Sequence, residues 1–139
     1  MVKILIIDKQ RSIRNILRER LEFEGYGAEA VEDLQGGRSI AQKIAFDIVL
    51  CEEVFFHEYV SAPGAFPEAC CFIVLSDTPA VDSAVKAMRA GAFDFVSQPV
   101  DMNYLYAAIK RAAVTEEEDA KPGAPPSANG FSATPAQTT

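Results

Sequence analysis

A short apolar run that ends in two acids constrains this chain more than any other feature. Residues 48–51 are Ile48-Val49-Leu50-Cys51, and Glu52 and Glu53 follow directly. A run without polar alternation is typical of a strand that is buried on both faces of a parallel sheet. Open α/β sheets bind ligands at the carboxyl ends of such strands. We therefore expect the function to depend on Glu52 and on the side chains that can meet it.

Similar runs recur along the chain and alternate with helical patterns. The other expected strands are residues 2–7, 26–31, 71–75 and 93–96. The expected helices are residues 11–24, a weak helix opened by Gly36-Gly37, an uncertain segment after Glu53, residues 80–90, and residues 102–113 with Asp101 as the cap. This alternation predicts one α/β domain, a doubly wound five-stranded parallel sheet of flavodoxin-like type with strand order 2-1-3-4-5.

The expected strand order brings particular polar residues to one edge of the sheet. Asp8 follows the first strand and should face Glu52 across the crevice between the first and third strands. Ser76 and Gln98 end the fourth and fifth strands and should reach the same edge.

The first helix shows two kinds of side chain on separate faces. We expect the apolar residues to point inward and the arginines to form a solvated outer face. The inward set is Ile13, Ile16, Leu17, Leu21 and Phe23, and the outer set is Arg11, Arg14 and Arg18.

Length and charge limit the classes of protein. The 139 residues fit one domain, and neither a membrane-length apolar run nor a secretory signal is visible, so we expect a soluble, cytoplasmic protein without membrane contact. The net charge of −7 argues against direct nucleic-acid binding. Cys51, Cys70 and Cys71 are interpreted as small buried thiols, and neither a metal nor a cofactor is expected.

The composition changes near the carboxyl end. We expect residues 1–115 to form the folded domain, and residues 116–139 to be an acidic and then Ala/Pro/Ser-rich flexible tail or linker.

Two stretches resemble a known family. They are Lys3-Ile4-Leu5-Ile6-Ile7-Asp8 and the run from Ile73-Val74-Leu75-Ser76 to Ala84-Val85-Lys86-Ala87-Met88-Arg89-Ala90-Gly91-Ala92-Phe93-Asp94-Phe95-Val96-Ser97-Gln98-Pro99-Val100. Both are similar to response-regulator receiver domains of two-component signalling, and the second resembles receivers of bacterial enhancer-binding regulators. The resemblance covers residues 2 to about 113. It implies transfer of a phosphoryl group from a histidine kinase to an aspartate, assisted by Mg²⁺.

The resemblance assigns a role to individual positions, and several of them depart from the family pattern. Asp8 matches the first of two metal-binding acids, but Lys9 stands at the second. Glu52 stands at the phosphoacceptor aspartate, and Gln98 at the lysine before the proline. The switch hydroxyl and aromatic residue are matched by Ser76 and Phe95.

Each departure weakens the family's chemistry. Lys9 replaces a metal-binding charge by a repelling one. The longer Glu52 side chain spoils the geometry of in-line transfer, and Gln98 supplies no charge to the phosphoryl group. We therefore interpret the chain as a degenerate receiver, a pseudo-receiver that is not an enzyme. Glu52 is expected either to be idle or to pair with Lys9 and fix one signalling state.

Three hypotheses about function follow. The first is a phosphorylation-independent signalling or adaptor module whose fourth helix, fifth strand and fifth helix contact a histidine kinase, an output domain or another signalling protein, with a homodimer as a further option. The expected exposed residues of this face are Asp82, Lys86, Arg89, Asp94, Tyr104, Tyr106 and Lys110.

The second hypothesis is an active receiver that is phosphorylated on Glu52 or Glu53. The third is an enzyme of another doubly wound class. It is weak because the segment after Asp8 has neither an Asp-x-Asp motif nor a phosphate-binding loop. His57 is interpreted as a surface histidine without a role.

Overall fold

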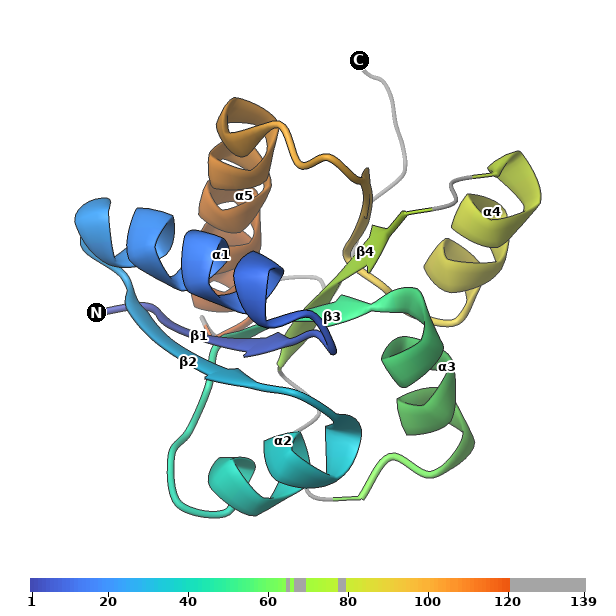
Figure 1. Cartoon of the computed structure of the whole chain (residues 1–139), viewed down its shortest axis with the longest axis horizontal. Coiled ribbons are helices and arrows are strands. Elements are labelled where there is room, and N and C mark those ends of the chain that lie inside the picture. The colour runs from blue at the N-terminus through green and yellow to red at the C-terminus, as the bar shows by residue number, and fades with distance from the viewer. Residues whose placement is uncertain (65, 67–69, 78–79, 121–139) are drawn as a thin grey trace.

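Parallel strands form a single sheet in the order β2-β1-β3-β4-β5, and helices cover both of its faces (Figure 1). This computed structural model describes residues 1–64, 66, 70–77 and 80–120. The strands are β1 (Lys3–Ile7), β2 (Gly27–Val31), β3 (Ile48–Glu52), β4 (Cys71–Ser76) and β5 (Asp94–Ser97). The helices are α1 (Arg11–Phe23), α2 (Leu34–Ala41), α3 (Glu53–Ser61), α4 (Val81–Arg89) and α5 (Met102–Ala120). The sequence-based fold class and strand order are confirmed.

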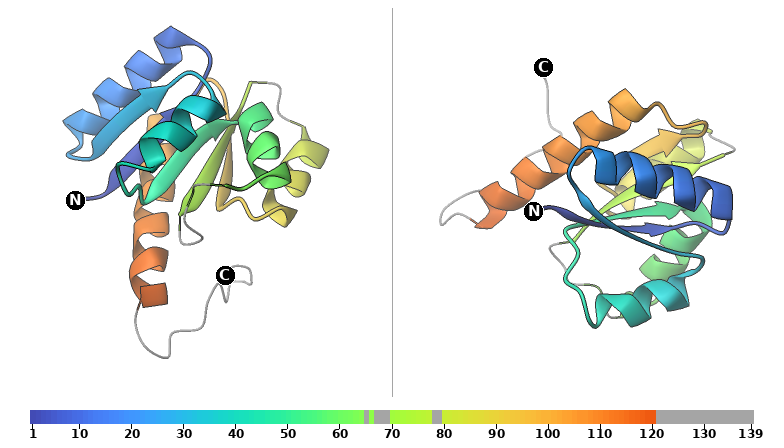
Figure 2. Two further views of the ribbon diagram at one scale, coloured as in Figure 1. Left: turned by 90° about the horizontal axis from the view of Figure 1, so that it is seen from below. Right: turned by 60° about the vertical axis from the view of Figure 1, so that its left-hand side comes forward.

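Side-chain alternation along the strands builds two cores, one on each face of the sheet. In β1, Ile4 and Ile6 pack toward α1 and α5, whereas Leu5 and Ile7 pack toward the helices of the opposite face. All four are fully buried. Figure 2 shows α1 and α5 together on one side of the sheet, with α2, α3 and α4 on the other. This two-sided burial explains the continuously apolar strand sequences.

The helix α2 begins earlier than its glycine pair indicated. The Asp33 carboxylate accepts a hydrogen bond from the Gly36 backbone N–H at 2.8 Å and caps the helix, which begins at Leu34, two residues before the glycines. Gly37 is buried, and a Cβ atom there would lie 2.8 Å from the Ile7 Cδ1 atom. Gly37 therefore allows α2 to approach β1 closely.

The uncertain segment after Glu53 forms the helix α3, which aromatic packing holds against β4. The Tyr59 ring stacks on the Phe72 ring at 4.2 Å between centroids, and the Phe56 ring lies 5.7 Å from the same ring. Phe66, beyond the end of the helix, contacts Phe72 edge-on at 5.6 Å. Rings at these distances contribute both buried area and favourable edge contacts. Tertiary packing thus stabilises a helix that the local sequence did not predict clearly.

The expected inward face of α1 is only partly correct. Leu17 and Leu21 are buried and Ile13 packs against the same core, but half of Ile16 is exposed and Phe23 is 88% exposed. Phe23 is only two positions after Leu21, so it lies on the other side of the helix. The prediction of a buried Phe23 is wrong.

The last helix is longer than expected. Asp101 caps it, because its Oδ1 atom accepts from the Asn103 backbone N–H at 3.0 Å. The helix then continues to Ala120, beyond the boundary at residue 115, so residues 116–120 are helical. The part of the expected flexible tail from residue 121 onward lies outside the described residues. Within the described part of the chain, no helix is both long and apolar enough to cross a membrane.

Candidate functional site

The parallel strands bring the polar residues singled out in the sequence to one edge of the sheet. Cα pairing of Ile7 with Cys51, and of Glu52 with Leu75, aligns the carboxyl ends of β1, β3 and β4. Ser76 pairs with Ser97 in the same way at the end of β5. The residues that meet at this edge are Asp8, Lys9, Glu52, Glu53, Ser76 and Gln98.

Glu52 turns toward the segment that follows β1. Its Oε1 atom accepts a hydrogen bond from the Lys9 backbone N–H at 2.7 Å, and its Oε2 atom lies 3.6 Å from the Lys9 Nζ atom. The Glu52 side chain is 13% exposed, whereas the Lys9 side chain is 63% exposed. The expected Lys9–Glu52 pair therefore exists, and the Glu52 carboxylate has partners within the protein.

Asp8 is a buried acid held mainly by local contacts. It is 1% exposed, and its Oδ1 atom accepts from the Gln10 backbone N–H at 2.8 Å. Burial raises the pKa of Asp8 above its usual value. The Gln10 hydrogen bond lowers the pKa, the charge of Glu52 raises it, and the Gln98 amide and Arg14 lower it by less, so the net direction is upward.

Glu53 makes a contact that the sequence analysis missed. The Ser76 hydroxyl donates a hydrogen bond to the Glu53 Oε1 atom at 2.9 Å, and Ser76 is only 4% exposed. The other carboxylate oxygen of Glu53 lies 3.5 Å from His57 Nε2, one helical turn further along α3. His57 thus has a contact partner, whereas the interpretation that it has no role stays a prediction. The i,i+4 spacing of Glu53 and His57 was the available signal.

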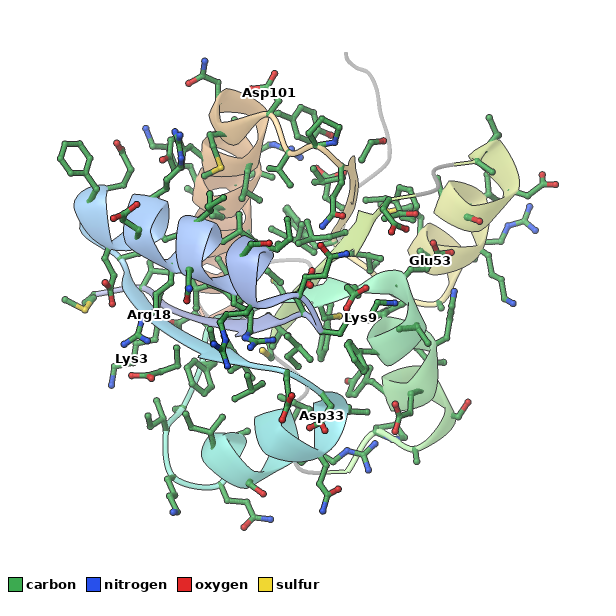
Figure 3. The ribbon with its side chains drawn as sticks, in the orientation of Figure 1. Lys3, Lys9, Arg18, Asp33, Glu53 and Asp101 are labelled. Atoms are coloured by element: carbon green, nitrogen blue, oxygen red, sulfur yellow. The ribbon has the colours of Figure 1, made fainter. Side chains whose placement is uncertain are left out.

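A polar pocket of about 330 Å³ opens between these residues. Figure 3 labels Lys9, which follows β1, and Glu53, the first residue of α3, and both line the pocket. The lining residues are Lys9, Glu52, Glu53, Val54, His57, Leu75, Ser76 and Asp77. Among the described residues there is no group of three side chains that could hold a metal ion. The Lys9 ammonium also repels a divalent cation, so this site does not fit Mg²⁺.

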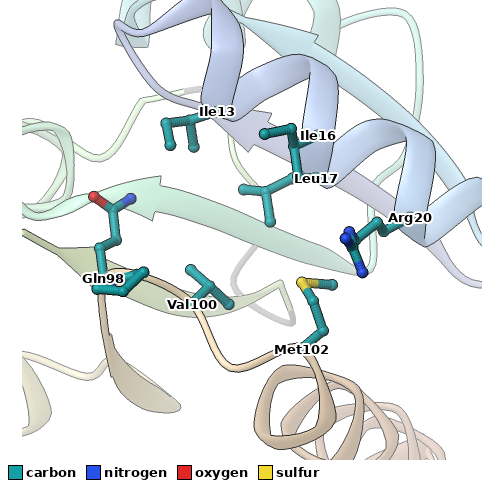
Figure 4. Close-up of a pocket in the computed structure, with 8 residues that line it drawn as sticks. Ile13, Ile16, Leu17, Arg20, Gln98, Val100 and Met102 are labelled. Carbon is teal, nitrogen blue, oxygen red and sulfur yellow. The ribbon is translucent and has the colours of Figure 1, made fainter.

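Gln98 lies at the junction of the site and a second, more apolar groove. Its backbone N–H donates to the Ser76 carbonyl oxygen at 2.8 Å, which ties the end of β5 to the end of β4. The groove has a volume of about 300 Å³ and separates α1 from the segment between β5 and α5 (Figure 4). Its lining is Ile13, Ile16, Leu17, Arg20, Gln98, Pro99, Val100 and Met102.

The surface of α4, β5 and α5 differs from the expected set of exposed residues. The Asp94 carboxylate is largely covered, because it accepts from the Tyr104 hydroxyl at 3.0 Å and pairs with Arg111 at 2.9 Å. Tyr106 faces α1 instead, where its hydroxyl donates to the Arg20 carbonyl oxygen at 3.4 Å. The remaining expected residues, Asp82, Lys86, Arg89, Tyr104 and Lys110, are exposed.

The same surface carries apolar side chains that were not anticipated. Val81, Val85 and Met88 are 79%, 42% and 45% exposed, and their i, i+4, i+7 spacing forms one stripe on α4. Phe95, the expected aromatic switch residue, is half-buried and packs against the core beneath α2, α3 and α4.

The cysteines are only partly as expected. Cys51 is buried in β3, and burial raises the pKa of its thiol strongly, which makes it a poor nucleophile. Cys70 and Cys71 are half-exposed, so the prediction of burial holds for Cys51 alone.

Comparisons with known proteins point to one family. The chain is 30% identical over 116 residues to the transcriptional regulatory protein ZraR of Klebsiella oxytoca, covering 80% of this chain and 26% of that protein. It is 25% identical over 126 residues to a putative response regulator NtrX-like of Rickettsia bellii, covering 81% and 25%. The chain thus spans about a quarter of the length of these curated relatives. No protein-family model matches it.

Solved structures agree on the fold. Full-length FixJ from B. japonicum has a TM-score of 0.76 at 24% identity, covering 86% of this chain and 61% of that chain. An atypical orphan response regulator, described with a phosphorylation-independent regulatory mechanism, has a TM-score of 0.65 at 22% identity, covering 80% and 94%. The domain therefore has the receiver fold, and its sequence resembles response-regulator receiver domains.

Proposed function

We propose that this domain is a phosphorylation-independent signalling or adaptor module that acts through contacts with another protein. The observation that carries the proposal is the Lys9–Glu52 contact. Both the backbone N–H and the side chain of Lys9 face the Glu52 carboxylate, at 2.7 and 3.6 Å. In the receiver family, as the resemblance implies, a metal-binding acid and the phosphoacceptor stand at these two positions.

The chemistry at this edge of the sheet supports the absence of phosphoryl transfer. A carboxylate engaged with an adjacent N–H and ammonium is a weakened nucleophile, and the ammonium repels the metal ion that transfer requires. Gln98 adds no positive charge to stabilise the phosphoryl oxygens.

The face formed by α4, β5 and α5 is the proposed contact surface. The exposed stripe of Val81, Val85 and Met88 on α4 offers apolar area for a protein partner, and the Asp94–Arg111 pair joins β5 to α5. The net charge of −7 favours a protein over nucleic acid as the partner. A histidine kinase, an output domain, another signalling protein or a second copy would each fit this description.

A second candidate is an active receiver phosphorylated on Glu52 or Glu53. It is favoured by the 330 Å³ pocket, which both acids line and which is open to a small phosphodonor. Incubation with acetyl phosphate and Mg²⁺, followed by intact mass measurement, separates the two candidates. We expect no increase of one phosphoryl mass in the wild-type chain, and a stoichiometric increase would overturn the first proposal.

The contact surface is tested with two matched substitutions of exposed valines. Val85→Asp lies in the α4 stripe, and Val60→Asp on α3 is the control, because the two side chains are 42% and 39% exposed. Once a partner has been identified by pull-down, Val85→Asp should weaken its binding at least about tenfold, as for a central interface residue. Equal effects of the two variants would contradict the assignment of this face.

A further inference from the structure

The second acid of the Glu52-Glu53 pair makes a contact of its own, away from Lys9. Glu53 is the first residue of α3, and its carboxylate reaches across to β4, where it accepts the Ser76 hydroxyl hydrogen bond at 2.9 Å. Ser76 is buried at the end of β4, so the acceptor of this hydroxyl is protein and not bulk water. A hydrogen bond to an ionised acceptor is stronger than one between neutral groups.

Two further contacts keep the Glu53 carboxylate in place. Its second oxygen faces His57 Nε2 at 3.5 Å, so the two oxygens have separate partners. Glu53 also lies in the first turn of α3, where the helix dipole favours a negative charge. Its side chain is 22% exposed, which limits competition from water.

The two adjacent acids therefore point in different directions. Glu52 engages Lys9 on the β1 side of the site, and Glu53 engages Ser76 on the β4 side. A strand that passes directly into a helix at this point produces the divergence, because Glu52 ends β3 and Glu53 begins α3.

The Ser76 contact is connected to the neighbouring strand through the backbone. The Ser76 carbonyl oxygen accepts the Gln98 N–H hydrogen bond at 2.8 Å, and Ser76 pairs with Ser97 in the sheet. A restraint on the Ser76 side chain thus acts on the same residue whose carbonyl oxygen accepts the backbone bond between the ends of β4 and β5.

We propose that Glu53 is a built-in ligand for the Ser76 hydroxyl, and that it holds the ends of β4 and β5 in one conformation without a phosphoryl group. This inference rests on the proposed function, because it names how the site is ordered in the absence of phosphorylation. Glu53 is a positioning residue that acts through Ser76.

The test uses hydrogen exchange of backbone amides in the full 139-residue chain, followed by NMR. The Gln98 amide reports the β4–β5 bond directly. In Glu53→Ala it should exchange at least about tenfold faster, the effect expected for loss of a hydrogen bond to a charged group. Glu58→Ala, at an exposed position of the same helix, is the control and should leave that rate unchanged.

A double-mutant comparison separates positioning from a general structural effect. If Glu53 acts through Ser76, then Glu53→Ala should not accelerate Gln98 exchange further in a Ser76→Ala background. Glu53→Gln, whose amide oxygen can still accept the hydroxyl, should restore part of the protection and remains informative if Glu53→Ala does not fold. An unchanged Gln98 rate in both Glu53 variants, or additive effects in the double mutant, would overturn the inference.

The outcome is independent of the phosphorylation assay. Uptake of phosphate by the wild-type chain would refute the proposed function. The exchange experiment uses unphosphorylated protein and tests only the contact between Glu53 and Ser76.

Discussion

Lys9 faces Glu52 with two donors, its backbone N–H at 2.7 Å and its ammonium at 3.6 Å. The first contact is independent of the lysine side chain and aims the carboxylate toward β1. The second depends on charge and lies at the exposed edge of the site. The position of Glu52 is therefore set by the backbone, while the electrostatic character of the site is set by Lys9.

Removing only the charge of Glu52 should have a small effect on stability. The amide oxygen in Glu52→Gln can still accept from the Lys9 N–H, and the 63% exposed Lys9 side chain can find water. We expect a change of less than about 1 kcal/mol in the free energy of unfolding, measured by urea denaturation. Glu22→Gln, which removes the exposed Arg18–Glu22 pair at 3.4 Å, is the matched control. A loss several times larger than in the control would mean that the ion pair is part of the fold's stability.

Magnesium should bind weakly because of Lys9. We expect the wild-type chain to show no saturable Mg²⁺ binding below about 1 mM in a titration, since Lys9 places an ammonium at the position where the resemblance to receivers implies a carboxylate ligand. Lys9→Asp should increase the affinity by adding a ligand and removing repulsion. Sub-millimolar binding by the wild-type chain that disappears in Asp8→Ala would refute this account of Lys9.

The buried Asp8 predicts a dependence of stability on pH. Burial raises its pKa in the folded state, so its contribution to stability is greatest when it is protonated, below the unfolded value, and is lost as the pH rises through the folded value. Asp8→Asn should therefore raise the melting temperature at pH 7, and the gain should shrink toward pH 4. Asp82→Asn, at an exposed position of α4, should show no such trend. A lower melting temperature of Asp8→Asn at pH 7 would mean that its neighbours favour the charged form.

The fold was predictable because each strand can be recognised from its own run of apolar residues. The apolar run at Ile48–Cys51 requires cover on both faces, and the alternation with helices leaves few topologies. The site was predictable only as a set of strand ends. The direction of Glu53 depends on a strand passing into a helix without a loop, and the helix α3 itself depends on rings such as Phe72 that are distant in sequence. The spacing of apolar and polar residues along the sequence indicates neither the direct passage of β3 into α3 nor the packing of α3 on Phe72.

Two apolar residues of α1 should show opposite sensitivity to truncation. Leu21 is fully buried and Phe23 is 88% exposed, although they are two positions apart. Leu21→Ala should cost about 2–5 kcal/mol in the free energy of unfolding, as for buried leucines generally. Phe23→Ala should change it by less than about 0.5 kcal/mol. Urea denaturation of both variants checks the helical phase of α1, and a large loss for Phe23→Ala would show that it packs on something in the full chain.

Restoring the residues that the receiver family has at the altered positions should be a stricter test than changing one of them. Glu52→Asp alone should remain unreactive with acetyl phosphate and Mg²⁺, because Lys9 still repels the metal and Gln98 still supplies no charge. The triple variant Lys9→Asp, Glu52→Asp, Gln98→Lys supplies the metal ligand, the shorter acceptor and the missing cation together, and should gain one phosphoryl mass. In the wild-type structure the Ser76 hydroxyl donates to the Glu53 carboxylate at 2.9 Å. Adding Glu53→Ala to the triple variant should therefore free this hydroxyl and increase the extent of labelling. Intact mass over time measures each step. Labelling of Glu52→Asp at the rate of the triple variant would show that Lys9 and Gln98 are not the disabling changes.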